Sequence, residues 1–221
     1  MLELLQKSWE PLLDTLYLTF VPLLLSVIFG FLIGTLIFIT SDNNLIEKNT
    51  PLLKLLNRIS DVLVNIFRSI PYLILLIWLI PFTQLLTGSV IGATAAIPSL
   101  VVSATPFFAR MVVIAFNEVD KGTIEASKAL GASLSDIIFK VLIPESKPAL
   151  ISSVAVTGIN LVSYSAMAGA VGAGGLGFEA YMYGIIRQNP QYMLVSTALI
   201  VIIVFAIQIV GDYLSKKTDK R

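Results

Sequence analysis

The chain of 221 residues contains neither cysteine nor histidine. Their absence excludes disulfides, thiol nucleophiles, Cys/His metal sites and imidazole bases. Charge is also scarce, because Asp, Glu, Lys and Arg make up 13% of the residues, against about 25% in soluble domains. Hydrophobic residues reach 56%. Too few charged residues remain to cover the surface of a water-soluble protein. The composition therefore predicts an integral membrane protein, and the net charge of +1 gives no indication of nucleic-acid binding.

Long stretches without charge predict where the chain crosses the membrane. They cover residues 15–41, 69–109, 148–178 and 188–211. A membrane helix needs about 20 apolar residues, so the second stretch holds two spans with a turn at Thr87–Gly92 between them. The first stretch is too long for the apolar region of a signal peptide. We expect one all-α membrane domain over residues 1–221, with five transmembrane helices at about 15–40, 66–86, 93–116, 149–170 and 192–212.

Lysine and arginine predict the orientation, because these residues favour the cytoplasmic side. An external N-terminus and a cytoplasmic C-terminus place 13 of the 15 on the inner side. Lys7 and Arg187 alone then remain outside. The segment 117–148 becomes a cytoplasmic loop.

That loop reads as two short helices joined at a glycine. Thr123 can cap a first helix ending at Leu130, and Gly131 suits the left-handed position after it. Ser133 and Asp136 have the spacing of a capping box for a second helix over 134–142, which Pro144 then stops or redirects. The small residues Ala126, Ser127 and Ala129 would let the first helix approach a partner closely, although an interfacial loop without a partner fits the same pattern.

The same residues resemble the EAA loop of permeases from ATP-binding cassette (ABC) importers. Glu125-Ala126-Ser127, Gly131 and Val141-Leu142-Ile143-Pro144 have its spacing, with Ser127, Val141 and Ile143 as conservative departures. The resemblance implies a type I importer permease whose cytoplasmic coupling helices dock into a separate ATP-binding subunit. It assigns the coupling role to Glu125, Ala126, Ser127, Gly131 and Pro144.

Two nucleotide-binding motifs bear on whether this chain holds a cofactor. The sequence has no G-x-x-x-x-G-K-[ST] loop, so we expect no bound cofactor and no enzyme activity, with ATP bound and hydrolysed by the partner subunit. Gly172 to Gly177 satisfies G-x-G-x-x-G, but it follows a predicted membrane helix rather than a strand, and no acidic residue lies about 20 residues later. We expect a helix that ends by close approach of backbones.

A polar stripe marks the fourth span. A water-filled translocation route would explain it, and so would hydrogen bonds between helices, because both keep polar groups away from lipid. Met167 at its end could close such a route with its flexible side chain, or its thioether could contact a ligand. The stripe consists of Ser153, Thr157, Asn160, Tyr164 and Met167.

No ionisable residue falls in the middle of a predicted span. This disfavours a proton- or sodium-coupled carrier, which needs buried relays, and it favours a neutral or zwitterionic solute. A secondary carrier remains the alternative of another class. A membrane enzyme or scaffold comes last, since no nucleophile–base pair lies in the spans.

Further segments resemble the methionine-uptake branch of these permeases: Asn65–Pro71, Pro106–Arg110, Tyr164–Gly177 and Gly211–Asp212. The resemblance implies import of methionine, as the L or D form or the sulfoxide, across the cytoplasmic membrane. It also implies a homodimer, two ATP-binding subunits and an extracytoplasmic substrate-binding lipoprotein. Methionine-containing peptides, phosphonates and quaternary amines are alternative solutes. Gly30 and Gly34 form a G-x-x-x-G pair for helix crossing, within or between subunits.

Overall fold

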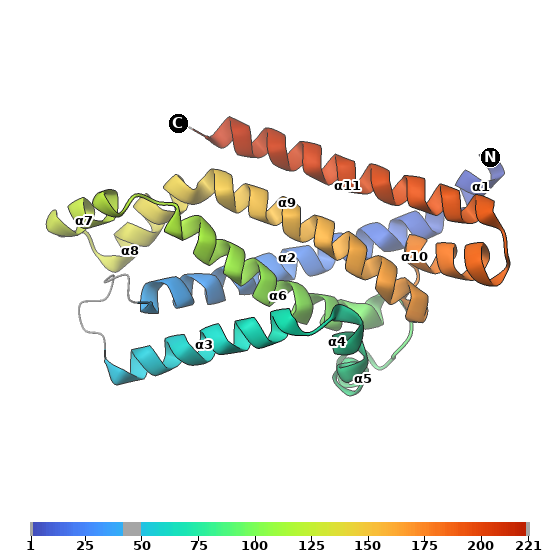
Figure 1. The fold of residues 1–221 in the computed structure, drawn as a ribbon, viewed down its shortest axis with the longest axis horizontal. Coiled ribbons are helices and arrows are strands. Elements are labelled where there is room, and N and C mark those ends of the chain that lie inside the picture. The colour runs from blue at the N-terminus through green and yellow to red at the C-terminus, as the bar shows by residue number, and fades with distance from the viewer. Residues whose placement is uncertain (1, 42–49, 220–221) are drawn as a thin grey trace.

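The computed structural model describes residues 2–41 and 50–219, and every regular element in these two stretches is a helix. Lys48, Lys220 and Arg221, counted above on the inner side, lie outside the described residues. Figure 1 shows an elongated bundle with α7 at one end and α1 and α10 at the other. The elements are α1 (Leu2–Lys7), α2 (Trp9–Thr40), α3 (Pro51–Ser69), α4 (Tyr72–Trp78), α5 (Ile80–Thr87), α6 (Ala93–Asn117), α7 (Lys121–Ala129), α8 (Leu134–Asp136), η1 (Ile137–Leu142), α9 (Ile143–Ala168), η2 (Gly169–Ala173), α10 (Gly175–Glu179), η3 (Ala180–Ile186) and α11 (Pro190–Thr218).

Four continuous helical segments in the described residues are long and apolar enough to cross a membrane: Trp9–Thr40, Ala93–Asn117, Leu134–Ala173 and Pro190–Thr218. They contain the expected spans 15–40, 93–116, 149–170 and 192–212. The chain is therefore a multi-pass membrane protein. The helices extend beyond the apolar windows because polar residues at both ends continue the same hydrogen-bonding pattern.

The expected span 66–86 is not one helix. It comprises the end of α3, then α4 and α5, and α3 and α4 are bent by 106° relative to each other. Ile70 leaves the helical region at φ −82°, ψ 123° because the following residue, Pro71, disfavours the α conformation before it. If α3 and α4 are counted as one broken span, the number of crossings becomes five.

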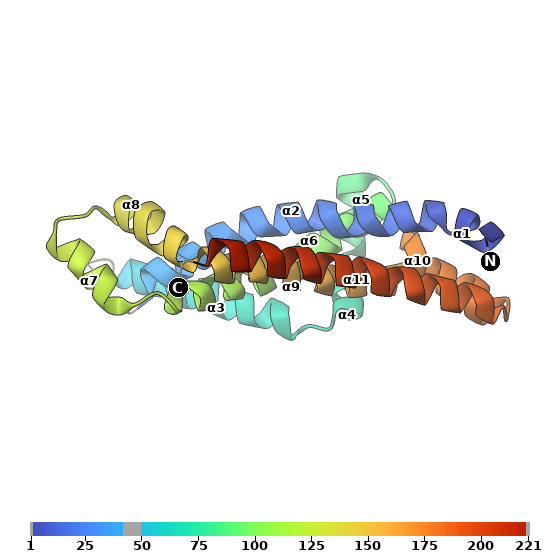
Figure 2. The same cartoon turned by 90° about the horizontal axis from the view of Figure 1, so that it is seen from above.

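Helices α2 and α6 cross at close range. A Cβ atom added to Gly34 would lie 2.5 Å from the Ala109 carbonyl oxygen, and one added to Gly30 would lie 2.8 Å from the Thr105 carbonyl oxygen. The G-x-x-x-G pair therefore acts within the subunit, where it lets the backbones approach. Helix α11 runs alongside α9 in both views (Figure 1 and Figure 2), and Figure 1 shows it on the side of the bundle opposite α3.

The glycine-rich segment after α9 folds back onto α2. Gly177 lies against the backbone of Ala166, without space for a side chain, and the N–H of Leu176 donates a 2.8 Å hydrogen bond to the Thr15 hydroxyl. The glycines thus permit close backbone approach, as the sequence predicted.

Candidate functional site

The helix α7 stands at the tip of the bundle, beyond the ends of the long helices (Figure 1). Asp120, not Thr123, caps it: the Asp120 carboxylate accepts a 3.0 Å hydrogen bond from the N–H of Thr123. The predicted cap was wrong because the Asp120 carboxylate accepts from the Thr123 N–H, so Thr123 lies inside the first turn of the helix. The helix therefore begins at Lys121.

The turn after α7 has the predicted form. Gly131 adopts φ +79°, and the N–H of Ala132 donates a 3.1 Å hydrogen bond to the Ser127 carbonyl. Ser133 and Asp136 then form the predicted capping box, in which each side chain accepts from the other residue's N–H. Local hydrogen bonds therefore define both the end of α7 and the start of the helix that follows it.

Pro144 does not stop the second helix. It stands in the first turn of α9, directly after a π-helical turn at Ile137–Leu142. A proline lacks an N–H group and is tolerated in a first helical turn, so the helical path continues into the membrane segment. The second helix of the loop and the fourth span form one continuous helical segment, Leu134–Ala173.

A buried apolar cluster anchors this loop to the bundle. Ile124 of α7, Ile137 and Leu142 of η1, and Phe38 and Phe116 of α2 and α6 all belong to it. Phe38 and Phe116 meet edge to face, with ring centroids 5.3 Å apart. The cluster therefore packs α7 against the ends of α2 and α6.

The outward side of the loop is accessible. Glu125 and Ala126 are exposed, and Ser127 is half-buried with its hydroxyl bonded to the Thr123 carbonyl. Leu130 is 89% exposed and Phe139 67% exposed. Neither residue is among those predicted from the sequence, although large apolar residues within the most polar loop indicate a contact surface.

The stripe of α9 is divided by its surroundings. Ser153 and Thr157 are buried, and their hydroxyls each donate a 2.7 Å hydrogen bond to the carbonyl four residues earlier. Asn160 and Tyr164 are half-buried, and Met167 is 49% exposed. The face available to a solute or a second subunit therefore carries the latter three residues.

Tyr164 also joins three helices. Its ring stacks on that of Tyr72 in α4 with centroids 4.8 Å apart. The Tyr72 hydroxyl lies 3.3 Å from the Ser99 hydroxyl of α6. The stack fixes the broken helix α4 against α9 and α6.

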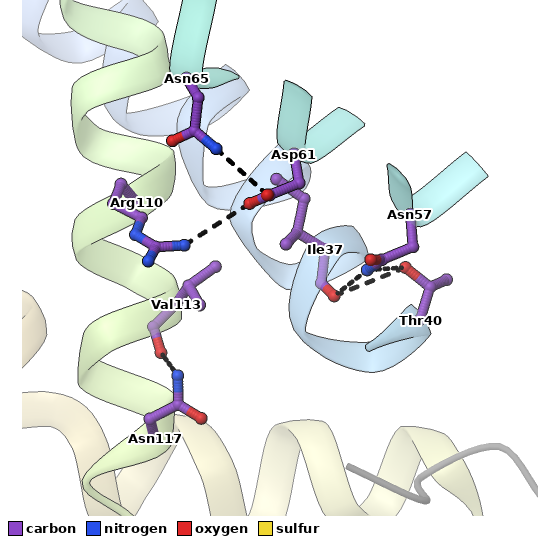
Figure 3. Close-up of polar contacts among 8 residues, drawn as sticks. All are labelled: Ile37, Thr40, Asn57, Asp61, Asn65, Arg110, Val113 and Asn117. Atoms are coloured by element: carbon purple, nitrogen blue, oxygen red, sulfur yellow. Dashed lines mark hydrogen bonds and ion pairs between the residues drawn. The ribbon is translucent and has the colours of Figure 1, made fainter. Parts of the chain in front are cut away.

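An ion pair lies between α3 and α6, as Figure 3 shows. Arg110 Nη1 is 3.5 Å from Asp61 Oδ1, and the Asn65 amide donates a 3.1 Å hydrogen bond to Asp61 Oδ2. Asp61 precedes the expected span 66–86, but α3 begins at Pro51 and brings this residue beside α6.

Asn57, one turn before Asp61 on the same face of α3, attaches this helix to α2. Its amide donates to the carbonyl of Ile37, at 2.8 Å, and to the hydroxyl of Thr40, at 2.9 Å (Figure 3). Within α3 only Val64 is buried. Polar contacts therefore contribute strongly to the attachment of α3.

Comparisons with known proteins agree with this architecture. Residues 50–221 match the family described as "Binding-protein-dependent transport system inner membrane component". The chain is 49% identical to the "Methionine import system permease protein MetP" of Bacillus subtilis (strain 168), over 98% of this chain and 96% of that protein. It is 43% identical to the "Probable D-methionine transport system permease protein MetI" of Pasteurella multocida (strain Pm70), over 97% and 99% of the two chains.

A solved structure has the same fold. A chain from the inward-facing MetNI methionine ABC transporter superposes with a TM-score of 0.90 at 43% identity. The match covers 100% of this chain and 98% of that one.

Proposed function

The chain belongs to the family of binding-protein-dependent transport system inner membrane components, and on that premise we propose that it is the permease subunit of an ABC importer that moves methionine, in the L or D form, across the cytoplasmic membrane. The names and the structure of the relatives support the solute and the class of transporter. The N-terminus lies outside and the C-terminus lies in the cytoplasm.

One observation of this chain carries the proposal: an exposed small-residue helix at the tip is anchored by a buried cluster. Ala126 offers little side-chain bulk, so a partner can approach the α7 backbone. Ile124 on the opposite side belongs to the same cluster as Phe116 of α6. This arrangement suits a coupling element: the partner subunit binds the exposed side of α7, and the buried side of α7 contacts the transmembrane helices.

The ATP-binding subunits supply the energy. The sequence has no P-loop, so hydrolysis takes place in the partner. Closure of two ATP-binding subunits shifts α7, and the cluster passes this displacement to α2, α6 and the continuous segment Leu134–Ala173. The partner must contact α7 differently in its two states, since a ligand shifts an equilibrium only through differential affinity.

The assembly is a homodimer with two ATP-binding subunits on the cytoplasmic side and a substrate-binding lipoprotein outside. Lipid surrounds the apolar faces of α2 and α11, where Leu24, Ile202 and Phe205 are more than 60% exposed. Asn160, Tyr164 and Met167 face the route between the two copies. Methionine-containing peptides, phosphonates and quaternary amines are the alternative solutes, and a secondary carrier is the alternative mechanism.

Uptake into proteoliposomes tests the function. The purified complex with its ATP-binding subunits and binding protein should accumulate labelled methionine only when ATP is present on the α7 side. Unlabelled methionine should compete, and a protonophore should have no effect. Uptake that persists without ATP and collapses with the membrane potential would identify a secondary carrier instead.

Crosslinking tests the coupling contact separately, because the chain has no native cysteine. Leu130→Cys on the tip should crosslink to an ATP-binding subunit carrying a surface cysteine. Ser89→Cys lies in an exposed turn outside this loop and should not. Equal crosslinking at both positions would contradict the docking role.

A further inference from the structure

A groove of about 490 Å³ lies between α2 and α3, over the surface of α6. None of the described residues that line it is charged, and its polar side chains are those of Ser60 and Thr105. Apolar side chains line it from all three helices, among them Phe29 and Ile33 of α2, Leu63 and Phe67 of α3, and Val101 and Val102 of α6.

The groove lies at the middle of a membrane span. Its lining on α6 runs from Val101 to Pro106, in the centre of a helix of 25 residues from Ala93 to Asn117. Such a helix is about 37 Å long at about 1.5 Å per residue, whereas the hydrocarbon core of a bilayer is about 30 Å thick. The centre of α6 therefore stays in the hydrocarbon core even if the membrane is shifted by a full helical turn.

Water does not suit this groove. A bound water needs two to four polar partners, and the lining side chains offer two hydroxyls for the whole volume. The Thr105 hydroxyl is buried and makes no hydrogen bond in the part of the chain that the structure describes. An empty groove would lose dispersion contacts along both walls, so an apolar group fills it.

The groove opens onto apolar surfaces on both of its sides. On α2, Leu32 follows Phe29 by one turn and is 61% exposed. On α3, Ile59, Leu63 and Ile66 recur every three or four residues, and each is about half exposed. The polar side chains of α3 lie on the other flank of that helix. The opening therefore faces the acyl chains of the bilayer.

The opposite side of α6 carries a second groove. Ile114 lines that groove together with Val156 of α9, and it follows Thr105 by nine residues. Nine residues turn a helix by about two and a half turns, so Thr105 and Ile114 point in opposite directions. Val156 lies one turn before Asn160, which the proposed function places on the route between the two copies. On that premise the groove between α2 and α3 faces away from the second copy.

We propose that the groove between α2 and α3 binds the distal half of an acyl chain of a membrane lipid. The chain packs Leu63 and Phe67 of α3 against Phe29 and Ile33 of α2. Because the lining has no charged residue among those described, the site recognises the hydrocarbon chain and not the headgroup. The bound chain strengthens the attachment of α3, in which only Val64 is buried by the rest of the chain.

Photolabelling of the complex with its ATP-binding subunits tests the occupant. The probes are phosphatidylcholine and phosphatidylglycerol with a diazirine near the end of one acyl chain, added in liposomes, with loosely held lipid removed in mild detergent before illumination. Residues 101–106 of α6 should carry at least fivefold more label than residues 202–205 of α11, where Ile202 and Phe205 are more than 60% exposed. Equal labelling of the two segments would overturn the proposal, and a tenfold preference for the anionic lipid would overturn recognition by the chain.

Variants separate the lipid from a second copy of the protein. Val102→Phe fills the groove and should lower its labelling at least fivefold, whereas Ile202→Phe adds a ring on the open face of α11 and should leave it unchanged. Thr105→Val keeps the shape of the groove and should keep the labelling, because a hydrocarbon chain accepts no hydrogen bond. If Thr105→Val abolishes the labelling or dissociates the homodimer, the occupant hydrogen-bonds to Thr105 and the proposal fails. These results do not depend on the solute that the protein transports.

Discussion

The Ser8 hydroxyl, between α1 and α2, donates a 2.8 Å hydrogen bond to Glu179 Oε1 of α10, across 171 residues of sequence. The second carboxyl oxygen of Glu179 accepts a 2.8 Å hydrogen bond from Ser196 of α11. Glu179 is only 2% exposed. One buried acidic side chain thus joins the first and last long helices at the end of the bundle opposite α7.

Glu179→Ala should lower the free energy of unfolding by about 2 kcal/mol, because two buried hydrogen bonds are lost. Thermal unfolding in detergent measures this change. Glu179→Gln keeps an acceptor and adds a donor that a serine hydroxyl can accept, so it should cost less than half as much. If the glutamine variant is as unstable as the alanine variant, hydrogen bonding alone does not explain this contact.

Gly131→Val should uncouple transport from ATP hydrolysis. A β-branched residue at φ +79° is strained by more than the ~1–2 kcal/mol of an ordinary side chain, so the turn between α7 and α8 changes shape. Gly88→Val is the matched control, since Gly88 has φ +73° with open space around it but lies after α5. Methionine uptake per ATP hydrolysed should fall at least tenfold in the first variant and stay normal in the second, with both proteins inserted.

Gly34→Ala should destabilise the α2–α6 crossing. The new methyl group would meet the Ala109 carbonyl oxygen at 2.5 Å and Val112 Cβ at 2.7 Å, and such overpacking costs about 1–3 kcal/mol. Gly158→Ala meets its neighbours at ordinary distances of 3.4 Å or more and should be neutral or stabilising, because alanine favours helices. Monodisperse yield and melting temperature in detergent compare the two, and equal losses would contradict the crossing as the cause.

Asn160→Leu should reduce methionine uptake severalfold without a loss of stability. Its amide is half-buried on the accessible side of α9. Thr157→Val is the comparison, since the Thr157 hydroxyl already bonds to the Ser153 carbonyl at 2.7 Å and is fully buried. Uptake should be normal in that variant. The opposite ranking of the two variants would place the route along the other part of the stripe.

Much of the fold could be predicted because it depends on local chemistry. The apolar windows of α6, α9 and α11 mark membrane helices by length and composition alone. Gly131 and the Ser133–Asp136 capping box could be predicted for the same reason, since each turn is closed by residues at most five positions apart. The loop spacing that indicates an ABC permease is likewise contained in one short segment.

The tertiary structure alone decided which distant residues meet. Asp61 falls between the expected spans 15–40 and 66–86, yet α3 places it 3.5 Å from Arg110. Glu179 meets Ser8 and Ser196, which are distant from it in sequence. The sequence determined that polar residues share a stripe on α9, because helical periodicity follows from spacing. It could not determine which of them stay accessible, because burial depends on the helices that pack alongside, and these come from elsewhere in the chain.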